Sequence, residues 1–381
     1  MDLSETPSQD SAPEPTLPAQ PGEISAPTPA VDEPPLLPPS TPATPPPAPF
    51  IFHGNATEYF RIWIVNTLLS VLTLGLFTAW AKVRKRRYLR GNTELLGHRF
   101  DYTADPRRIL IGNLIVVILF LAYALFGVVY PAVRFISIGV IVVFLPWIVV
   151  RSLSFNAHHT VWRGLRFRFH PSLSAAAMVY LFQPLVIVVT LGIYYPAWVR
   201  ARSAFSISRH RLGTAYFRFH ATASPFYGVY FAAGAMVVAA VIIIGVIVGF
   251  LTSQHAGHLP TTTQLLPLLL FYAATLYVAK HFVFAALFNH LWNGTQLDEH
   301  RFRGRMRPGP WLKLQLVNLA AIVASAGLLY PWALIRSTRY VQSCLEFIPA
   351  GPLDTITRLG EGEGSAVGDT AAEFTSLDFG L

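Results

Sequence analysis

The chain has 381 residues, of which 53% are hydrophobic and only 13% are charged, and its mean hydropathy is +0.45. A soluble domain contains about 25% charged residues, so this composition excludes an ordinary soluble enzyme. It also excludes a wholly disordered chain, which would be poor in apolar residues. The net charge of +9 is unevenly spread, because the basic residues lie between long apolar runs, as in a membrane protein.

The first predicted domain, residues 1–49, is a disordered acidic tail. Residues 1–50 contain 16 of the 30 prolines and seven acidic residues, but no Lys or Arg. This composition favours a solvated tether with polyproline II segments; a protein partner that binds proline-rich sequence is the alternative. A second disordered acidic tail is predicted over 349–381, since residues 351–381 hold six acids and one base, Arg358.

The membrane domain is predicted over 50–348. A spanning helix needs about 20 apolar residues, and seven segments qualify: 59–80, 109–130, 132–150, 174–199, 226–252, 264–288 and 312–335. The first, fourth and seventh differ from the others, because Gly75, Gly192 and Gly327 each precede an aromatic cluster that holds a Trp. Gly and Pro interrupt helices, so these three segments are expected to be broken.

Four tryptophans near the ends of apolar segments are each followed by an arginine four residues later. The pairs are Trp80 and Arg84, Trp147 and Arg151, Trp198 and Arg202, and Trp332 and Arg336. On a helix this spacing places both side chains on one face, where Trp at the headgroup level and Arg beyond it form an interfacial anchor. The predicted partner is the lipid bilayer, through its anionic headgroups; ligand binding is the alternative role.

Short stretches of alternating aromatic residues lie beside the basic linkers, at 50–54, 99–102, 166–169, 216–219 and 301–303. A period of two predicts short β-strands, which belong outside the hydrocarbon layer. Strand, broken segment, linker and helical hairpin recur over 50–150 and 167–288, with a partial copy over 302–340. The expected fold is mainly α: a polytopic helical membrane protein with internal repeats, seven apolar segments and short cytoplasmic β-strands.

Two topologies are open. If all seven segments span the membrane, the basic linkers 200–225 and 289–311 lie outside, against the positive-inside rule. If the three broken segments are re-entrant, every basic linker is cytoplasmic, and only a turn at 131–134 and the uncharged loop 252–263 lie outside. The charge rule favours this second arrangement, with four spans and both tails in the cytoplasm.

The sequence contains little that could support catalysis or metal binding. Cys344 is the single cysteine, and the pairs His158-His159 and His255-x-x-His258 have no acidic residue nearby. No catalytic motif is found, so neither an enzyme nor a cofactor is expected. Lys280 and His281 lie inside the sixth segment and are candidate intramembrane functional residues, although the lysine could also snorkel to the interface.

Several motifs resemble a known family. They are Phe52-His53-Gly54, Glu58-Tyr59-Phe60, Leu72-Thr73-Leu74-Gly75, Trp80-Ala81-Lys82-Val83-Arg84, Arg87-Tyr88 and Asn92-Thr93, and later Thr190-Leu191-Gly192, Arg163 to Phe167, Tyr330-Pro331-Trp332 and Arg339-Tyr340. Over about 50–348 the chain resembles DUF898, also called the YjgN family, a bacterial inner-membrane family of unknown function. The resemblance implies a protein of the bacterial cytoplasmic membrane and implies no activity.

Two functions are therefore considered. The first is a membrane scaffold or anionic-lipid-interacting protein, favoured by the Trp and Arg side chains at the membrane boundary. The second is a small-solute or ion transporter, favoured by the repeats, the broken segments and Lys280. Inverted repeats would favour the transporter, whereas parallel repeats leave the choice open. Nucleic-acid binding is not expected, because the basic residues are tied to membrane boundaries.

The sidedness of the 200–225 linker distinguishes the two topologies. We expect an Arg209→Cys variant in a Cys344→Ser background to resist an impermeant thiol reagent on intact cells and to react after permeabilisation. Labelling of intact cells would instead place this basic linker outside and exclude re-entrant segments.

Overall fold

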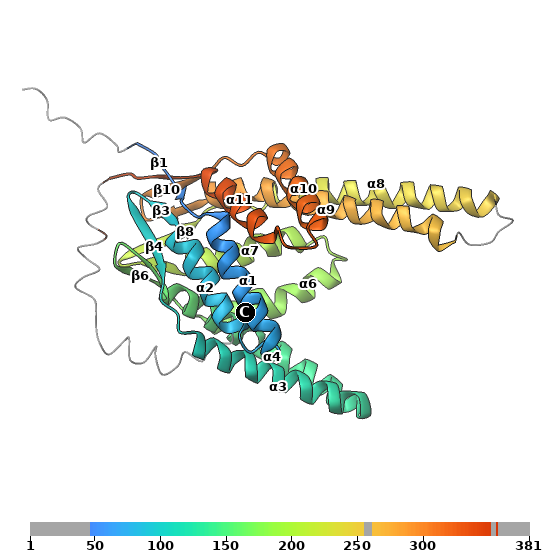
Figure 1. Ribbon diagram of the computed structural model, residues 1–381, viewed down its shortest axis with the longest axis horizontal. Helices are drawn as coiled ribbons and strands as arrows, with labels where there is room; N and C mark the ends of the chain where they lie inside the picture. Colours follow the sequence, from blue (N-terminus) through green and yellow to red (C-terminus); the bar gives the residue numbers. More distant parts are fainter. Residues whose placement is uncertain (1–45, 255–260, 352–355, 357–381) are drawn as a thin grey trace, which may run out of the picture. The chain divides into compact units, whose positions relative to one another are not determined.

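The computed structural model describes residues 46–254, 261–351 and Ile356, which belong to one compact unit, Thr44–Leu381 (Figure 1). The strands are β1 (Ala48–Pro49), β2 (Ile51–Phe52), β3 (Thr93–Leu95), β4 (His98–Tyr102), β5 (Thr160–Trp162), β6 (Leu165–Phe169), β7 (His210–Leu212), β8 (Ala215–Phe219), β9 (Thr295–Leu297), β10 (His300–Gly304) and β11 (Leu345–Ile348). The helices are α1 (Ala56–Leu72), α2 (Thr78–Gly91), α3 (Pro106–Val129), α4 (Pro131–His158), α5 (Leu173–Ala177), the π-helical turn η1 (Met178–Phe182), α6 (Gln183–Val189), α7 (Tyr195–Ser208), α8 (Ser224–Gln254), α9 (Thr262–Asn293), α10 (Pro308–Ala324) and α11 (Tyr330–Ser343).

All eleven strands belong to one antiparallel sheet, in the order β1-β11-β10-β9-β8-β7-β6-β5-β4-β3-β2. Strands β1 and β2 are two parts of one segment on either side of Phe50; β1 pairs with β11 and β2 pairs with β3. The Phe50 N–H donates to the Leu345 carbonyl at 3.2 Å. The first segment therefore lies at both ends of the sheet and nearly closes it into a barrel.

The predicted fold class, mainly α with short cytoplasmic β-strands, is wrong about the strands, because they form one eleven-stranded sheet. Each strand is short, as expected, but the strands pair side by side across the whole length of the domain. A two-residue strand or an isolated hairpin is barely stable in water. Joining all of them in a nearly closed sheet pairs their backbone groups and leaves little exposed strand edge.

The sheet divides the domain into five units of one design: a long strand, a pair of helices and a short strand. The units cover 48–95, 98–162, 165–212, 215–297 and 300–348. Each is closed by the same backbone hydrogen bond, from His53 N to Asn92 O at 2.8 Å in the first unit and from Arg305 N to Cys344 O at 2.8 Å in the last. The repeats predicted from the sequence, 50–150, 167–288 and 302–340, have other bounds than these units. They stay a prediction.

A row of phenylalanines fills the inside of the sheet. Phe100, Phe167, Phe217 and Phe302 are each the third residue of their strand, and Phe50 takes the same place in the first segment. Neighbouring rings stack, with centroids 6.5 Å apart for Phe100 and Phe167, 6.1 Å for Phe167 and Phe217, and 6.2 Å for Phe217 and Phe302. Beyond the last strand, the buried Ile356 packs into this same core.

Three units have short helical pairs, and these contain the broken segments. The chain reverses at Leu74-Gly75, Leu191-Gly192 and Ala326-Gly327, where the first residue has φ near 50° and the glycine φ of 90–92°. Glycine adopts this left-handed backbone at little cost. In the first turn the Thr73 hydroxyl accepts from the Phe77 N–H at 3.0 Å. Segments 59–80, 174–199 and 312–335 are therefore helical hairpins whose two ends return to the sheet.

The other two units carry long helical pairs, α3 with α4 and α8 with α9, which correspond to the four remaining predicted segments. Among the described residues, three helices are long and apolar enough to cross a membrane: Ala132–His158, Ser224–Gln254 and Thr262–Asn293. Their apolar side chains are largely uncovered, as for Val246 (68% exposed) and Leu269 (62%). Such a large apolar surface requires an apolar surrounding.

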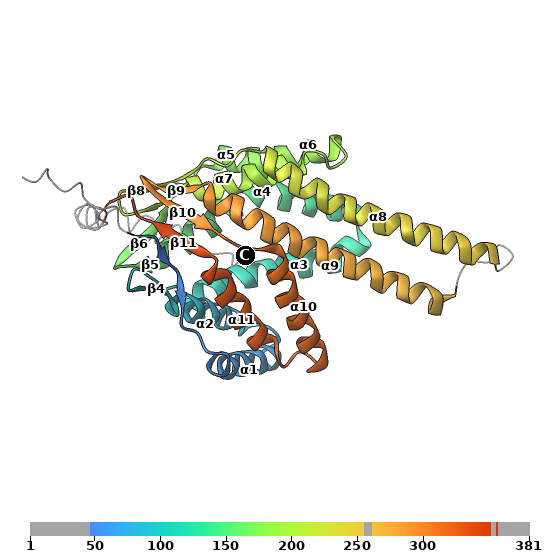
Figure 2. The same cartoon turned by 90° about the horizontal axis from the view of Figure 1, so that it is seen from above.

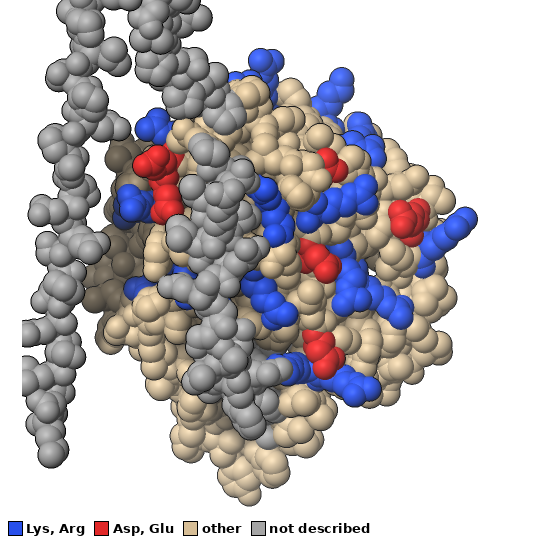
Figure 3. Space-filling model, turned by 90° about the vertical axis from the view of Figure 1, so that its left-hand side faces the viewer, with Lys and Arg blue, Asp and Glu red and all other residues tan. Residues whose placement is uncertain are grey.

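The helical pairs lie on one side of the sheet in both views, and α8 and α9 extend furthest from it (Figures 1 and 2). At the opposite end, Lys and Arg side chains are scattered over the surface and outnumber the acidic side chains that lie among them (Figure 3). The domain thus has an apolar helical part and a basic sheet part.

The stacked phenylalanines predict where the sheet is most sensitive to substitution. Phe217→Ala should destabilise the protein by roughly 3 kcal/mol, because a large ring is lost from a packed core. Tyr216→Ala removes the exposed neighbouring ring and should change stability by less than about 0.5 kcal/mol. The thermal unfolding midpoint of each variant in detergent measures the difference, and equal midpoints would contradict a core role for the ring.

Candidate functional site: a basic layer where the helices meet the sheet

Three of the four predicted Trp–Arg pairs are in contact. The guanidinium carbon lies over the indole ring at 5.6 Å for Arg151 and Trp147, at 5.1 Å for Arg202 and Trp198, and at 5.0 Å for Arg336 and Trp332. These distances are typical of cation–π contacts. Each pair lies on the last helix of its unit, about two to four turns before the short strand. The three pairs therefore occupy equivalent positions in different units.

The first predicted pair is arranged differently. Arg84 lies 5.5 Å from the ring of Phe77, and that ring stacks on Trp80 with centroids 5.8 Å apart. The Arg84 guanidinium also donates to the side-chain oxygen of Asn66 on α1, at 3.3 Å. Arg84 therefore bridges α2 and α1 and does not cover Trp80.

A cavity of about 480 Å³ lies at the seam where the last unit meets the first. It is lined by His53, Gly54, Asn55 and Ala56 before and at the start of α1, and by Trp332, Ile335, Arg336 and Arg339 on α11. None of these lining residues is acidic. The predicted pair Trp332 and Arg336 thus opens into this seam cavity, and Arg339 donates to the Gly54 carbonyl at 2.9 Å across the seam.

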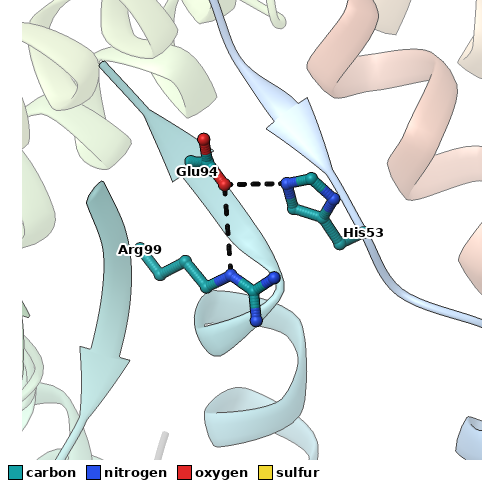
Figure 4. A network of polar contacts seen from close by, with 3 residues as sticks. All are labelled: His53, Glu94 and Arg99. Atoms are coloured by element: carbon teal, nitrogen blue, oxygen red, sulfur yellow. Dashed lines mark hydrogen bonds and ion pairs between the residues drawn. The ribbon is translucent and has the colours of Figure 1, made fainter. Parts of the chain in front are cut away.

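Polar contacts hold one wall of the seam cavity in place (Figure 4). The His53 ring contacts the Glu94 carboxylate on β3 at 2.8 Å, and Arg99 on β4 lies 4.0 Å from the same oxygen. At the start of α1, Asn55 accepts from the Thr57 N–H at 2.9 Å and caps the helix. The imidazole and the helix start therefore have fixed positions on the first unit's side of the cavity.

A second basic cavity of about 450 Å³ lies between α1 and α2. It is lined by Arg61, Arg84 and Arg87 together with Ile62, Val65 and Tyr88. Helix α1 thus has cationic side chains on two sides. Arginine suits such sites, because its planar group can donate to both oxygens of a phosphate.

Lys280 and His281 do not belong to the seam cavity. Both lie on α9; Lys280 is exposed, and the His281 ring packs against Tyr277 at 4.4 Å and against Trp311 of α10 at 5.9 Å. A functional role for these two residues stays a prediction.

Sequence reasoning missed two buried amides and one half-buried amide, Gln183, in the short helical pairs. Asn66, Gln183 and Asn318 each lie eight residues before the left-handed turn residue of their unit. Asn66 is 6% exposed and Asn318 is 2% exposed, and Asn318 donates to the Ser337 hydroxyl at 2.9 Å. Their constant distance from the Leu-Gly or Ala-Gly turn was the available signal.

Among the residues that the structure describes, no group of three or more His, Cys, Asp or Glu side chains is placed to hold a metal ion. His158 and His159 lie side by side, with ring centroids 5.2 Å apart. The pair His255 and His258 lies outside the described residues.

Three histidines near the sheet are partly or largely buried, and burial lowers their pKa values. Burial, followed by the nearby His158 and Arg108, lowers the pKa of His159 to about 4. Burial also lowers the pKa values of His210 and His300. In each case the folded protein favours the neutral ring, whereas the unfolded chain would bind a proton near pH 6.5.

The sign of these shifts predicts a loss of stability in acid. Stability should be greatest above pH 6.5 and should fall as the pH decreases toward 4, because protons bind the unfolded chain more tightly. His159→Phe keeps a ring against Phe155 and should reduce the difference in unfolding midpoint between pH 7.5 and pH 5. His170→Phe, which removes an exposed imidazole, is the matched control. An unchanged pH dependence in His159→Phe would refute the assignment.

The uncovered apolar helices and the basic layer beside them define an α-helical membrane protein that carries a sheet outside the apolar part. The DUF898 profile, described as a bacterial protein of unknown function, matches residues 47–374. The chain belongs to this family, as its motifs predicted.

Relatives with curated names agree with a membrane location. The inner membrane protein YjgN of Escherichia coli K12 is 32% identical over 149 residues, which is 38% of this chain and 36% of that protein. The YjgN protein of Salmonella typhimurium LT2 is 31% identical over 144 residues, again 38% of this chain and 36% of the relative. The matches thus span only about a third of these relatives. No solved structure matches the chain.

Proposed function

We propose that this protein is a bacterial inner-membrane protein that holds anionic phospholipid headgroups in a basic layer on the cytoplasmic face. The observation that carries the proposal is the seam cavity, where Arg336 and Arg339 face a space without acidic lining residues. A phospholipid phosphate matches this space in charge and in its need for hydrogen-bond donors.

The connectivity supports a single-sided arrangement. Both ends of every helical pair are attached to the same sheet, so the helices leave and return on one side. The connections between helices and strands, next to the sheet, are rich in Arg and Lys, whereas the loop 252–263 at the far end of a helical pair has no charged residue. The positive-inside rule predicts that such basic connections lie in the cytoplasm. The short pairs are then re-entrant or interfacial, and the long pairs span the membrane.

The Trp–Arg pairs support a boundary position for the cavity. Trp147, Trp198 and Trp332 occur at similar heights in their units, 12 or 13 residues before the short strand begins. Tryptophan prefers the headgroup level of a bilayer. A lipid that inserts its tails beside α1 and α11 would therefore present its phosphate to Arg336.

The direction of the repeats does not add support to the transporter hypothesis and leaves it open. All five units run in the same direction, from long strand through helices to short strand. They are parallel repeats, whereas many carriers alternate between states through inverted repeats.

The proposal is tested by lipid retention. The full chain is reconstituted in phosphatidylcholine containing a minor fraction of phosphatidylglycerol, extracted in mild detergent, and assayed for bound lipid by mass spectrometry. Wild type should retain phosphatidylglycerol selectively. Arg336→Gln should lower retention roughly tenfold, since a charged hydrogen bond contributes about 1.5–3 kcal/mol.

The matched control is Arg107→Gln, which removes an exposed arginine at the start of α3, away from the seam. It should retain lipid like wild type. Equal losses in both variants would indicate a nonspecific charge effect, and no loss in Arg336→Gln would exclude the cavity as the headgroup site.

A further inference from the structure

One part of the outer sheet surface is covered by arginines. Along each strand the inner residues, such as Phe167, Leu212 and Phe217, pack in the core, so their neighbours point outward. On β6, β7, β8 and β10 these outward positions hold five arginines, here called the arginine face: Arg166, Arg168, Arg211, Arg218 and Arg301.

The arginine face is poorly neutralised by the rest of the domain. No Asp or Glu occurs in the sequence between Asp105 and Asp298, a stretch that holds every member of the arginine face except Arg301. Elsewhere on the sheet, Glu94 lies beside Arg99, and Glu346 lies beside Arg303 and Arg305. Among the described residues, the arginine face has no ion pair of this kind.

Two of its members are directly opposed. The register of β6 and β7 places Arg168 opposite Arg211, with Phe167 opposite Leu212 and Phe169 opposite His210. Like charges at directly opposite positions destabilise a sheet. An anionic segment lying across β6 and β7 would remove this repulsion.

We infer that the acidic C-terminal segment of the chain, residues 357–381, docks on the arginine face. The segment carries Glu361, Glu363, Asp369, Glu373 and Asp378 against a single base, Arg358. Its charge is complementary to the arginine face, and its length allows several carboxylates to meet several guanidinium groups at once.

The structure also shows where this segment starts. Ile356 is buried in the sheet core together with Leu212 of β7 and Ala215 of β8. From there the chain can extend about 3.4 Å per residue, and neighbouring strands are about 4.8 Å apart. Glu361 and Glu363 lie five and seven residues beyond Ile356, so they can reach about 17 and 24 Å from it, which is several strand spacings across the sheet.

This docking would make the segment a reversible cover of the basic sheet surface. The contact is between exposed charges, so salt should weaken it: the screening length falls from about 10 Å at 0.1 M to about 3 Å at 1 M. The site is separate from the seam cavity, because none of the five arginines lines that cavity, and its test does not depend on lipid binding.

The test is photocrosslinking of the full chain in membranes, with benzoylphenylalanine replacing Tyr216, an exposed residue between Arg211 and Arg218 on the outer surface. Trypsin cleaves after Arg358 and releases 359–381 as one peptide, whereas the N-terminal tail remains in a peptide that ends at Arg61. We expect the monomeric protein to yield an adduct with 359–381, and high salt to reduce it.

Charge variants separate the possible occupants. Changing the five acids after Ile356 to their amides should lower the adduct roughly fivefold or more, since each exposed ion pair contributes little but several act together. The matched control neutralises five acids of the N-terminal tail, Glu5, Asp10, Glu14, Glu23 and Asp32, and should leave the adduct unchanged. Benzoylphenylalanine at Ile51, on the outer surface of β2 near Glu94, should give little adduct with 359–381.

Each alternative result overturns the inference. Adducts with the N-terminal peptide, with phospholipid or with another protein would assign the arginine face to those partners. A crosslinked dimer would assign it to a second copy of the chain. Persistence of the 359–381 adduct after its acids are neutralised would show that charge does not drive the contact.

Discussion

The pairing of the last strand with the first segment determines the rest of the structure. β11 hydrogen-bonds to β1, Phe50 continues the contact, and β2 passes on to β3. Without this pairing the sheet would have two exposed edges with unpaired backbone groups. With it, eleven short strands support one another, and five helical pairs are held side by side at fixed positions.

Closure also creates the seam cavity. Helix α11 packs beside α1 only because their units are neighbours around the sheet, although they lie at opposite ends of the domain sequence. Arg336 and His53 consequently face one space from the two ends of the sequence. The hydrogen bond from Arg339 to the Gly54 carbonyl fastens the same contact on the helical side.

The sequence was sufficient to predict the local features. Apolar length identified the long helices, period-two alternation located the strands beside Phe100, Phe167 and Phe217, and the spacing of Trp and Arg identified three real contacts. These features depend on residues close together in the chain. The pairing of Ala48 with Phe347 could not be predicted, because it depends on the return of the chain after five units.

The broken segments were also only partly predictable from the sequence. The glycines at 75, 192 and 327 signalled an interruption, but they did not reveal that the helix reverses there instead of kinking. Reversal depends on a second left-handed residue, Leu74, Leu191 or Ala326, which are residue types that rarely adopt this backbone. The buried amides were missed because a single Asn or Gln in an apolar helix does not indicate whether its side chain is buried or exposed.

The nearly closed sheet has a consequence for biosynthesis. The first strand leaves the ribosome long before its partner β11 exists, and at 5–20 residues per second the delay is roughly 15–60 s. During this time the helical pairs can enter the bilayer one by one, while the growing sheet keeps an open edge. Final assembly can begin only after β11 has been synthesised, so a chain truncated before Leu345 would lack the strand that closes its sheet and remain a target for quality control.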